Sequence, residues 1–127
     1  TLISKSVSSG SGNAVARFLV HIGDKAENAM VYTKCDAMLI DKESKATAYP
    51  YLESKRDDAS LAHEASIGKI SQDAIDYLMS RGISEDDAKA MIVFGFISDS
   101  IRDLPLDYLL ELKRLVKLNI EKEKKVN

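Results

Sequence analysis

The feature that most constrains the fold is a change of periodicity after Gly68. Between Val15 and Ile67, short runs of β-prone residues alternate with polar turn clusters, a rhythm typical of a β-rich region. Beyond Gly68 the apolar residues recur at helical spacing. With 127 residues the chain is long enough for one compact domain and too short for a multidomain enzyme. The sequence therefore predicts a β-rich half over 1–68 and a small helical domain over 69–127.

Five β-prone runs are expected in the first half, and they cover residues 15–20, 30–33, 37–40, 47–51 and 60–63. The opening stretch Ser6–Gly12 is rich in Ser and Gly and is expected to be flexible or a turn. Pro50 has no N–H to donate, so its strand should be short, lie at a sheet edge or be interrupted. The amino-acid sequence shows no clear internal repeat of roughly 20–50 residues.

Three helices are expected in the second half. Ser71 is a predicted N-cap of the first helix and Gly82 its predicted end. Ser84 precedes three acidic residues, a pattern that favours the start of a second helix. Pro105 is well placed in the first turn of a third, whose charged end, 121–125, should be solvated and frayed.

Composition excludes several classes of protein. The formal net charge of −2 lacks the positive field that drives nucleic-acid binding. No run approaches the roughly 20 apolar residues that span a bilayer, and Thr1–Lys5 does not resemble a signal peptide, so we expect a cytoplasmic protein without membrane contact. The single cysteine, Cys35, cannot form an intramolecular disulfide or supply a four-thiolate metal site.

Three residue types in the β-rich half could carry chemistry. Cys35 is either a small buried residue or a reactive thiol, whose thiolate form Lys34 would favour if it lies close and Asp36 would oppose. His63 and Glu64 are adjacent, so on a strand they point to opposite faces. Beside a thiol they could bind iron or zinc, and otherwise they would be a hydrogen-bonded histidine and a solvated glutamate.

A self-contained enzyme is not expected. The sequence has no Gly-rich phosphate loop, no His-Glu-x-x-His, no Cys-x-x-Cys and no Gly-x-Ser-x-Gly. In the second predicted helix, Phe94 and Phe96 lie about 200° apart and cannot both face one core. One of them is therefore expected to be available to a partner.

Several ordered motifs together resemble the C-terminal part of the SufB/SufD family, components of the SUF iron–sulfur cluster assembly machinery. The motifs that carry the resemblance are His63–Ile70, Tyr77–Ser84 and Met91–Phe96, extended by Thr1–Lys5, Cys35–Ile40, Tyr49–Tyr51 and Leu104–Leu106. The resemblance covers nearly the whole sequence. Because Cys35, His63 and Glu64 are all present, the chain looks more like SufB, or an archaeal-type common SufB/SufD protein, than a bacterial SufD.

The resemblance implies a fold. Residues 1–68 would be the last rungs of a right-handed parallel β-helix, and residues 69–127 the small three-helix domain that follows it. An unpaired N-terminal edge of such a β-helix would need cover, so we expect a homo-oligomer of this chain.

The resemblance also implies a function, that of a non-enzymatic scaffold subunit. In SufB-like members the cysteine that corresponds to Cys35 is implicated as a sulfur acceptor and cluster ligand, accompanied by the glutamate that corresponds to Glu64. In SufD-like members the histidine that corresponds to His63 is implicated. A transient iron–sulfur cluster is therefore expected on Cys35, Glu64 and His63 in the full assembly, and none on the isolated chain.

The expected partners are a SufC-type ABC ATPase and a second SufB/SufD-type subunit. The resemblance assigns the ATPase contact to apolar residues of the helical domain, namely Phe94, Phe96, Ile97, Leu104 and Leu106. The alternative is a protein-interaction module that only recruits or regulates the ATPase, with Cys35 structural. Thiol reactivity separates the two, because only a scaffold needs an accessible sulfur acceptor.

Overall fold

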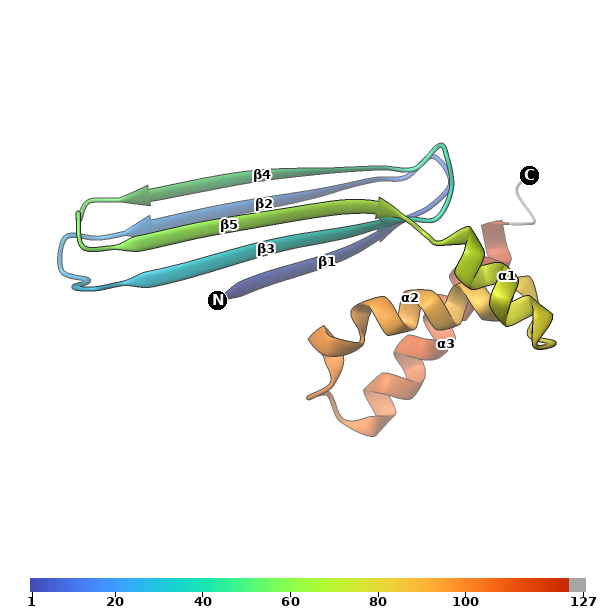
Figure 1. Cartoon of the computed structure of the whole chain (residues 1–127). Coiled ribbons are helices and arrows are strands. Elements are labelled where there is room, and N and C mark those ends of the chain that lie inside the picture. The colour runs from blue at the N-terminus through green and yellow to red at the C-terminus, as the bar shows by residue number, and fades with distance from the viewer. Residues whose placement is uncertain (124–127) are drawn as a thin grey trace. The chain divides into compact units, whose positions relative to one another are not determined.

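The computed structural model describes residues 1–123 and divides the chain into two compact units, Thr1–Gly68 and Lys69–Asn127. The first unit holds five strands, β1 (Leu2–Ser8), β2 (Asn13–Ile22), β3 (Met30–Leu39), β4 (Lys45–Ser54) and β5 (Ser60–Lys69). Short turns join them, and consecutive strands run in opposite directions (Figure 1). Within this unit the chain therefore travels back and forth along one axis.

Consecutive strands belong to different sheets. β1, β3 and β5 form one sheet and β2 and β4 the other, and the pairs β1–β3 and β2–β4 are parallel. Leu2 pairs with Thr33, and Asn13 pairs with Lys45, so the chain returns to the same register after 31 and 32 residues. This repeat of 31 or 32 residues is not visible in the amino-acid sequence, because paired positions carry unlike residues, such as Ser4 beside Cys35.

Two sequence-based expectations about the strands are wrong. Residues 6–8, assigned to a flexible or turn segment, belong to β1. The two runs 30–33 and 37–40 are one strand, β3, which continues through Lys34, Cys35 and Asp36. In both places pairing with a neighbouring strand satisfies the backbone, and this outweighs the weak β-propensity of serine, lysine and aspartate.

Pro50 lies within β4, which is ten residues long and uninterrupted. Of the three alternatives for this strand, the sheet edge is the one observed, because β2 is the only described neighbour of β4. Pro50 pairs with Phe18 in the parallel register. A residue without an N–H is tolerated there because one side of an edge strand needs no ladder bond.

Carboxylates organise the turns. Asp41 accepts hydrogen bonds from the Glu43 and Ser44 amides and, across the unit, from the amide of Gly10. Asp58 is paired with Arg56, which together with the Asn28 amide lowers the pKa of Asp58 to about 2. Each of these side chains joins turns about 30 residues apart.

The second unit holds α1 (Gln72–Ser80), α2 (Glu85–Ile101) and α3 (Leu106–Glu123). The N-caps predicted at Ser71 and Ser84 are confirmed, since each hydroxyl accepts a hydrogen bond from an amide three residues on. Gly82 ends α1 with φ of +85°, a conformation that favours glycine. Pro105 immediately precedes α3 and its carbonyl accepts from the Tyr108 and Leu109 amides.

The buried residues of the second unit are apolar side chains from all three helices, Ile75, Ala88, Val93 and Ile120. Of the tail that was expected to fray, Lys124 and Lys125 lie outside the described residues. None of the described helices is long and apolar enough to cross a membrane.

The packing of α1 depends on Ile75, whose side chain is fully buried. We expect Ile75→Ala to lower the free energy of unfolding of the helical unit by about 2–4 kcal/mol, because it leaves a cavity as well as losing apolar burial. Tyr77→Ala, on an exposed position of the same helix, should cost clearly less. Urea unfolding followed by far-ultraviolet circular dichroism measures both, and equal losses would contradict the assignment of Ile75 to the core.

Candidate functional site

The strands β3 and β5 separate the candidate residues onto two faces of their sheet. Thr33 is buried, and its hydroxyl lies 2.7 Å from Nδ1 of His63. Glu64, the next residue, contacts Tyr32 and Lys34 on the exposed side. The prediction that His63 and Glu64 point to opposite faces is therefore confirmed.

The inner face lies toward the second sheet. His63 meets the ring of Phe18, from β2, edge-on at a centroid distance of 6.2 Å. Its Nδ1 is engaged with Thr33, whereas its Nε2 is buried and has no hydrogen-bond partner among residues 1–123. Cys35 is two residues beyond Thr33 on the same strand, so it lies on this same face. The inner face thus holds a thiol and an imidazole nitrogen without a partner.

Burial controls the chemistry of Cys35, which is only 5% exposed. Desolvation, and secondarily the charge of Asp36, raises the pKa of its thiol. Lys34 would favour the thiolate only if it lay close to Cys35, and its ammonium lies on the other face, 3.1 Å from Glu64 and 3.8 Å from Asp36. Cys35 is therefore held as a neutral thiol.

Four residues of β3 and β5 form an outer cluster, Tyr32, Lys34, Asp36 and Glu64. The Tyr32 hydroxyl donates to Oε2 of Glu64 at 2.7 Å, while Lys34 contacts Oε1, so both carboxylate oxygens are occupied. The hydrogen bond from Tyr32, and then that from Lys34, lowers the pKa of Glu64. The same contact with Glu64 raises the pKa of Lys34. Glu64 is thereby held as an ionised carboxylate in one orientation.

The three residues predicted to bind a cluster are not all brought together. Cys35 and His63 share the inner face, and Glu64 lies on the outer one. Within residues 1–123 no group of three His, Cys, Asp or Glu side chains is placed to hold a metal ion. Sequence reasoning missed Thr33 and Tyr32, since strand alternation around Cys35 gives their faces but not their partners on β5.

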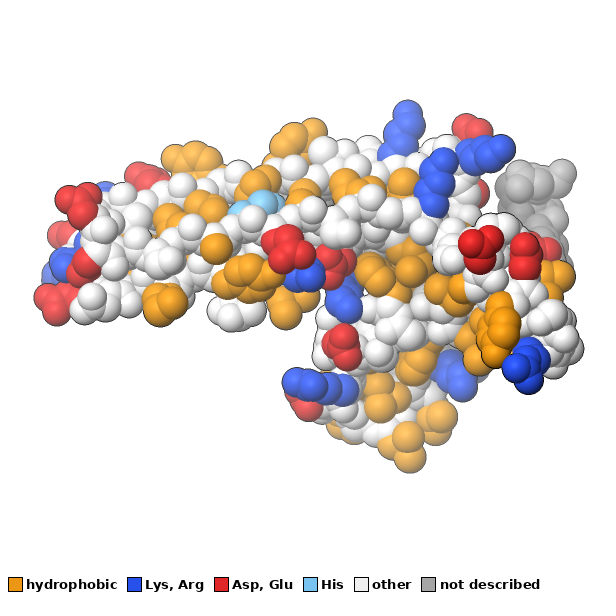
Figure 2. Space-filling view, in the orientation of Figure 1, with side chains coloured by type: hydrophobic (Ala, Val, Ile, Leu, Met, Phe, Trp, Pro, Cys, Tyr) orange, Lys and Arg blue, Asp and Glu red, His pale blue; other side chains and the backbone are white. Residues whose placement is uncertain are grey.

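The residues predicted to bind the ATPase differ in exposure. Phe94, Phe96 and Ile97 are partly buried, whereas Leu104 and Leu106 are exposed. Further large hydrophobic side chains are exposed on the helical unit, namely Tyr77, Met79, Met91, Tyr108, Leu110 and Leu115. In the space-filling view, hydrophobic side chains interrupt the charged surface of this unit (Figure 2).

Comparison with known proteins places these observations in a family. Residues 1–96 match the SufBD core domain of the SUF system for iron–sulfur cluster assembly. An iron–sulfur cluster assembly SufBD family protein of Staphylococcus saprophyticus is 45% identical over 121 residues, 95% of this chain and 26% of that protein. One of Mycobacterium tuberculosis is 42% identical over 120 residues, 94% of this chain and 14% of that protein. The chain spans about a quarter or less of these relatives.

The burial and raised pKa of Cys35 predict a slow thiol. Near neutral pH, we expect iodoacetamide to alkylate Cys35 in the folded chain at least about tenfold more slowly than in the urea-unfolded chain. Mass spectrometry of timed samples gives both rates. Similar rates in the two states would show that the thiol is accessible and not held neutral by burial.

The Tyr32 hydroxyl is the main cause of the lowered pKa of Glu64. Tyr32→Phe should therefore move this pKa up toward its ordinary value of 4.5, as followed by carbon NMR of the glutamate carboxyl groups. Glu64 stabilises the fold at pH values above 4.5 and this contribution is lost as the pH falls through its lowered pKa, so the variant should lose less stability on acidification. Tyr51→Phe, whose hydroxyl is 3.5 Å from Glu53, is the matched control and should leave Glu64 unchanged.

Proposed function

This chain belongs to the SufBD family of iron–sulfur cluster assembly proteins, and we propose that it acts there as the C-terminal region of a non-enzymatic scaffold subunit. The observation that carries the proposal is the family match over residues 1–96, which includes Cys35, His63 and Glu64. The family membership also confirms the resemblance drawn from the motifs. The scaffold would work in the cytoplasm.

The β-rich unit supports a second part of the proposal, that residues 1–68 are the last rungs of a right-handed parallel β-helix. Strands that alternate between two sheets and pair in parallel every 31 or 32 residues are what stacked rungs of a solenoid require. β1 and β2 lie at sheet edges among the described strands. Preceding rungs, a second copy of this chain or a SufB/SufD-type subunit would cover these edges.

The cluster would be cargo rather than a permanent cofactor. Thiolate sulfur from Cys35 and imidazole nitrogen from His63 are suitable ligands for iron, and the buried Nε2 of His63 has no other described partner. Glu64 faces the opposite side of the sheet, so it would contribute through a second subunit that meets the outer face. A cluster that is held by only a few protein ligands, and by ligands of different types, is bound loosely. Such binding favours transfer of the cluster over its storage.

The helical unit would bind a SufC-type ABC ATPase, which would supply the ATP chemistry. Exposed apolar side chains on α2 and α3, Leu106 among them, support a protein contact there. The alternative is a module that only recruits or regulates this ATPase. The burial of Cys35 and its raised pKa favour that alternative, because a sulfur acceptor must become an accessible thiolate.

Anaerobic cluster assembly separates the two candidates. In the SUF complex that contains the full-length subunit, we expect Cys35→Ser to lower bound iron and sulfide at least about tenfold, because the main sulfur ligand is lost. Iron and sulfide analysis of the purified complex measures the effect. Tyr51→Phe, on the outer face of the other sheet, is a control that should load normally. Normal loading of the Cys35→Ser complex would overturn the scaffold role of Cys35 and support recruitment alone.

A further inference from the structure

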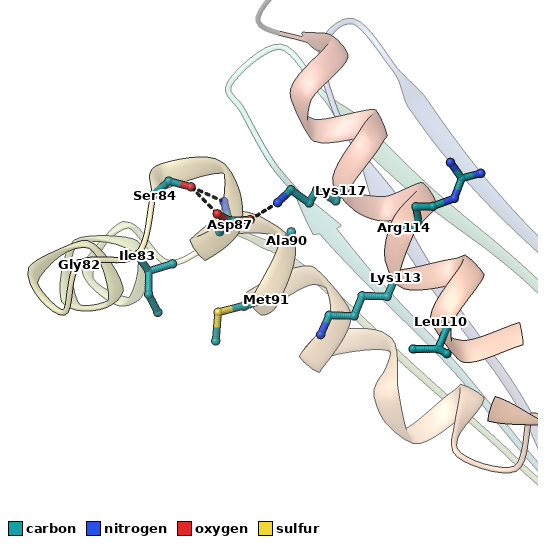
Figure 3. A pocket seen from close by; sticks show the side chains of 10 residues that line it. All are labelled: Gly82, Ile83, Ser84, Asp87, Ala90, Met91, Leu110, Lys113, Arg114 and Lys117. Atoms are coloured by element: carbon teal, nitrogen blue, oxygen red, sulfur yellow. Dashed lines mark hydrogen bonds and ion pairs between the residues drawn. The ribbon is translucent and has the colours of Figure 1, made fainter. Parts of the chain in front are cut away.

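The helical unit contains a groove of about 650 Å³ between the α1–α2 turn, α2 and α3. Ile83 comes from the turn, Met91 from α2, and Leu110 and Lys113 from α3 (Figure 3). None of the five residues assigned to the ATPase contact from the sequence lines it. The groove is therefore a surface distinct from the predicted one.

The lining of the groove is largely apolar, and the helical unit does not bury it. Met91 on α2 is 50% exposed, and Leu110 on α3 is 58% exposed. Ile83 and Ala90 add further apolar surface at partly buried positions. A partner that covered these side chains would remove apolar surface from water, which favours binding.

The charge of the lining is positive in a chain whose formal net charge is −2. Lys113, Arg114 and Lys117 line the groove on α3, opposed within the lining only by Asp87. Lys117 pairs with Asp87 at 2.7 Å, and Arg114 pairs with Glu111 on its own helix at 2.8 Å. Lys113 forms no ion pair with any residue between 1 and 123. Lys113, beside the apolar side chains of Met91 and Leu110, is thus available to pair with an acidic group of a partner.

We propose that this groove binds an acidic amphipathic helix of the ATPase partner. One apolar side chain of that helix packs between Met91 and Leu110, and a carboxylate beside it pairs with Lys113. A groove between two helices fits a third helix, and the net positive lining selects an acidic one. A single unpaired cation on an apolar floor is poorly suited to a nucleic-acid backbone. The proposal rests on the proposed docking of an ATPase.

The test is calorimetric titration of the full 127-residue chain with the SufC-type ATPase of the same organism. We expect Lys113→Glu to weaken binding at least about fivefold, and Met91→Ala combined with Leu110→Ala to weaken it similarly. Because the Lys113 contact is electrostatic, added salt should weaken binding of the original chain more than that of Lys113→Glu. Circular dichroism confirms that each variant remains folded.

Two variants outside the groove serve as controls. Lys122→Glu makes the same charge change nine residues on, about 180° around α3 from Lys113. Met79→Ala truncates an exposed apolar side chain of α1, a helix that is not part of the proposed ATPase contact. Both should bind like the original chain. If the original chain binds and the groove variants bind equally well, or the controls weaken as much, the groove proposal is overturned while ATPase docking stands. If the original chain does not bind, both proposals are overturned.

Discussion

Parallel pairing between strands two apart in the chain is the constraint on which the β-rich unit depends. Leu2 beside Thr33 and Asn13 beside Lys45 set offsets of 31 and 32 residues, and every turn must close at a length that keeps these offsets. The carboxylates of Asp41 and Asp58, which bond amides of distant turns, serve the same register. A shift of one residue in the pairing of any of these strands would move each of its side chains to the other face of the sheet.

This register also divides the chemistry of the unit. It places Cys35 and His63 on the face toward the second sheet, and Tyr32, Lys34 and Glu64 on the opposite face. The inner residues lie in low dielectric, which keeps the thiol neutral. The outer residues form charged and hydrogen-bonded pairs that keep Glu64 ionised. Two short segments, one on β3 and one on β5, thus supply groups with opposite electrostatic environments to two different surfaces.

The helical unit follows different rules. Its boundaries depend on local contacts, such as the Ser71 and Ser84 hydroxyls that accept amide hydrogen bonds three residues away. Its surfaces depend on packing between helices, which leaves Met91 and Leu110 exposed and Phe94 and Phe96 partly covered. Helical spacing alone showed that two phenylalanines could not share one face, but it could not show which apolar residues the other helices would cover.

The sequence by itself determined the change from strands to helices after Gly68, the caps at Ser71, Ser84 and Gly82, and the family. The caps depend on contacts within a few residues, and the family is recognised from several motifs that follow one another in a fixed order along the chain. Only the tertiary structure decided that residues 6–8 join a strand, that β3 runs unbroken through Cys35, and that Thr33 and Tyr32 meet His63 and Glu64. The partners in those contacts are about 30 residues apart, and their meeting depends on strand register, which local propensity does not encode.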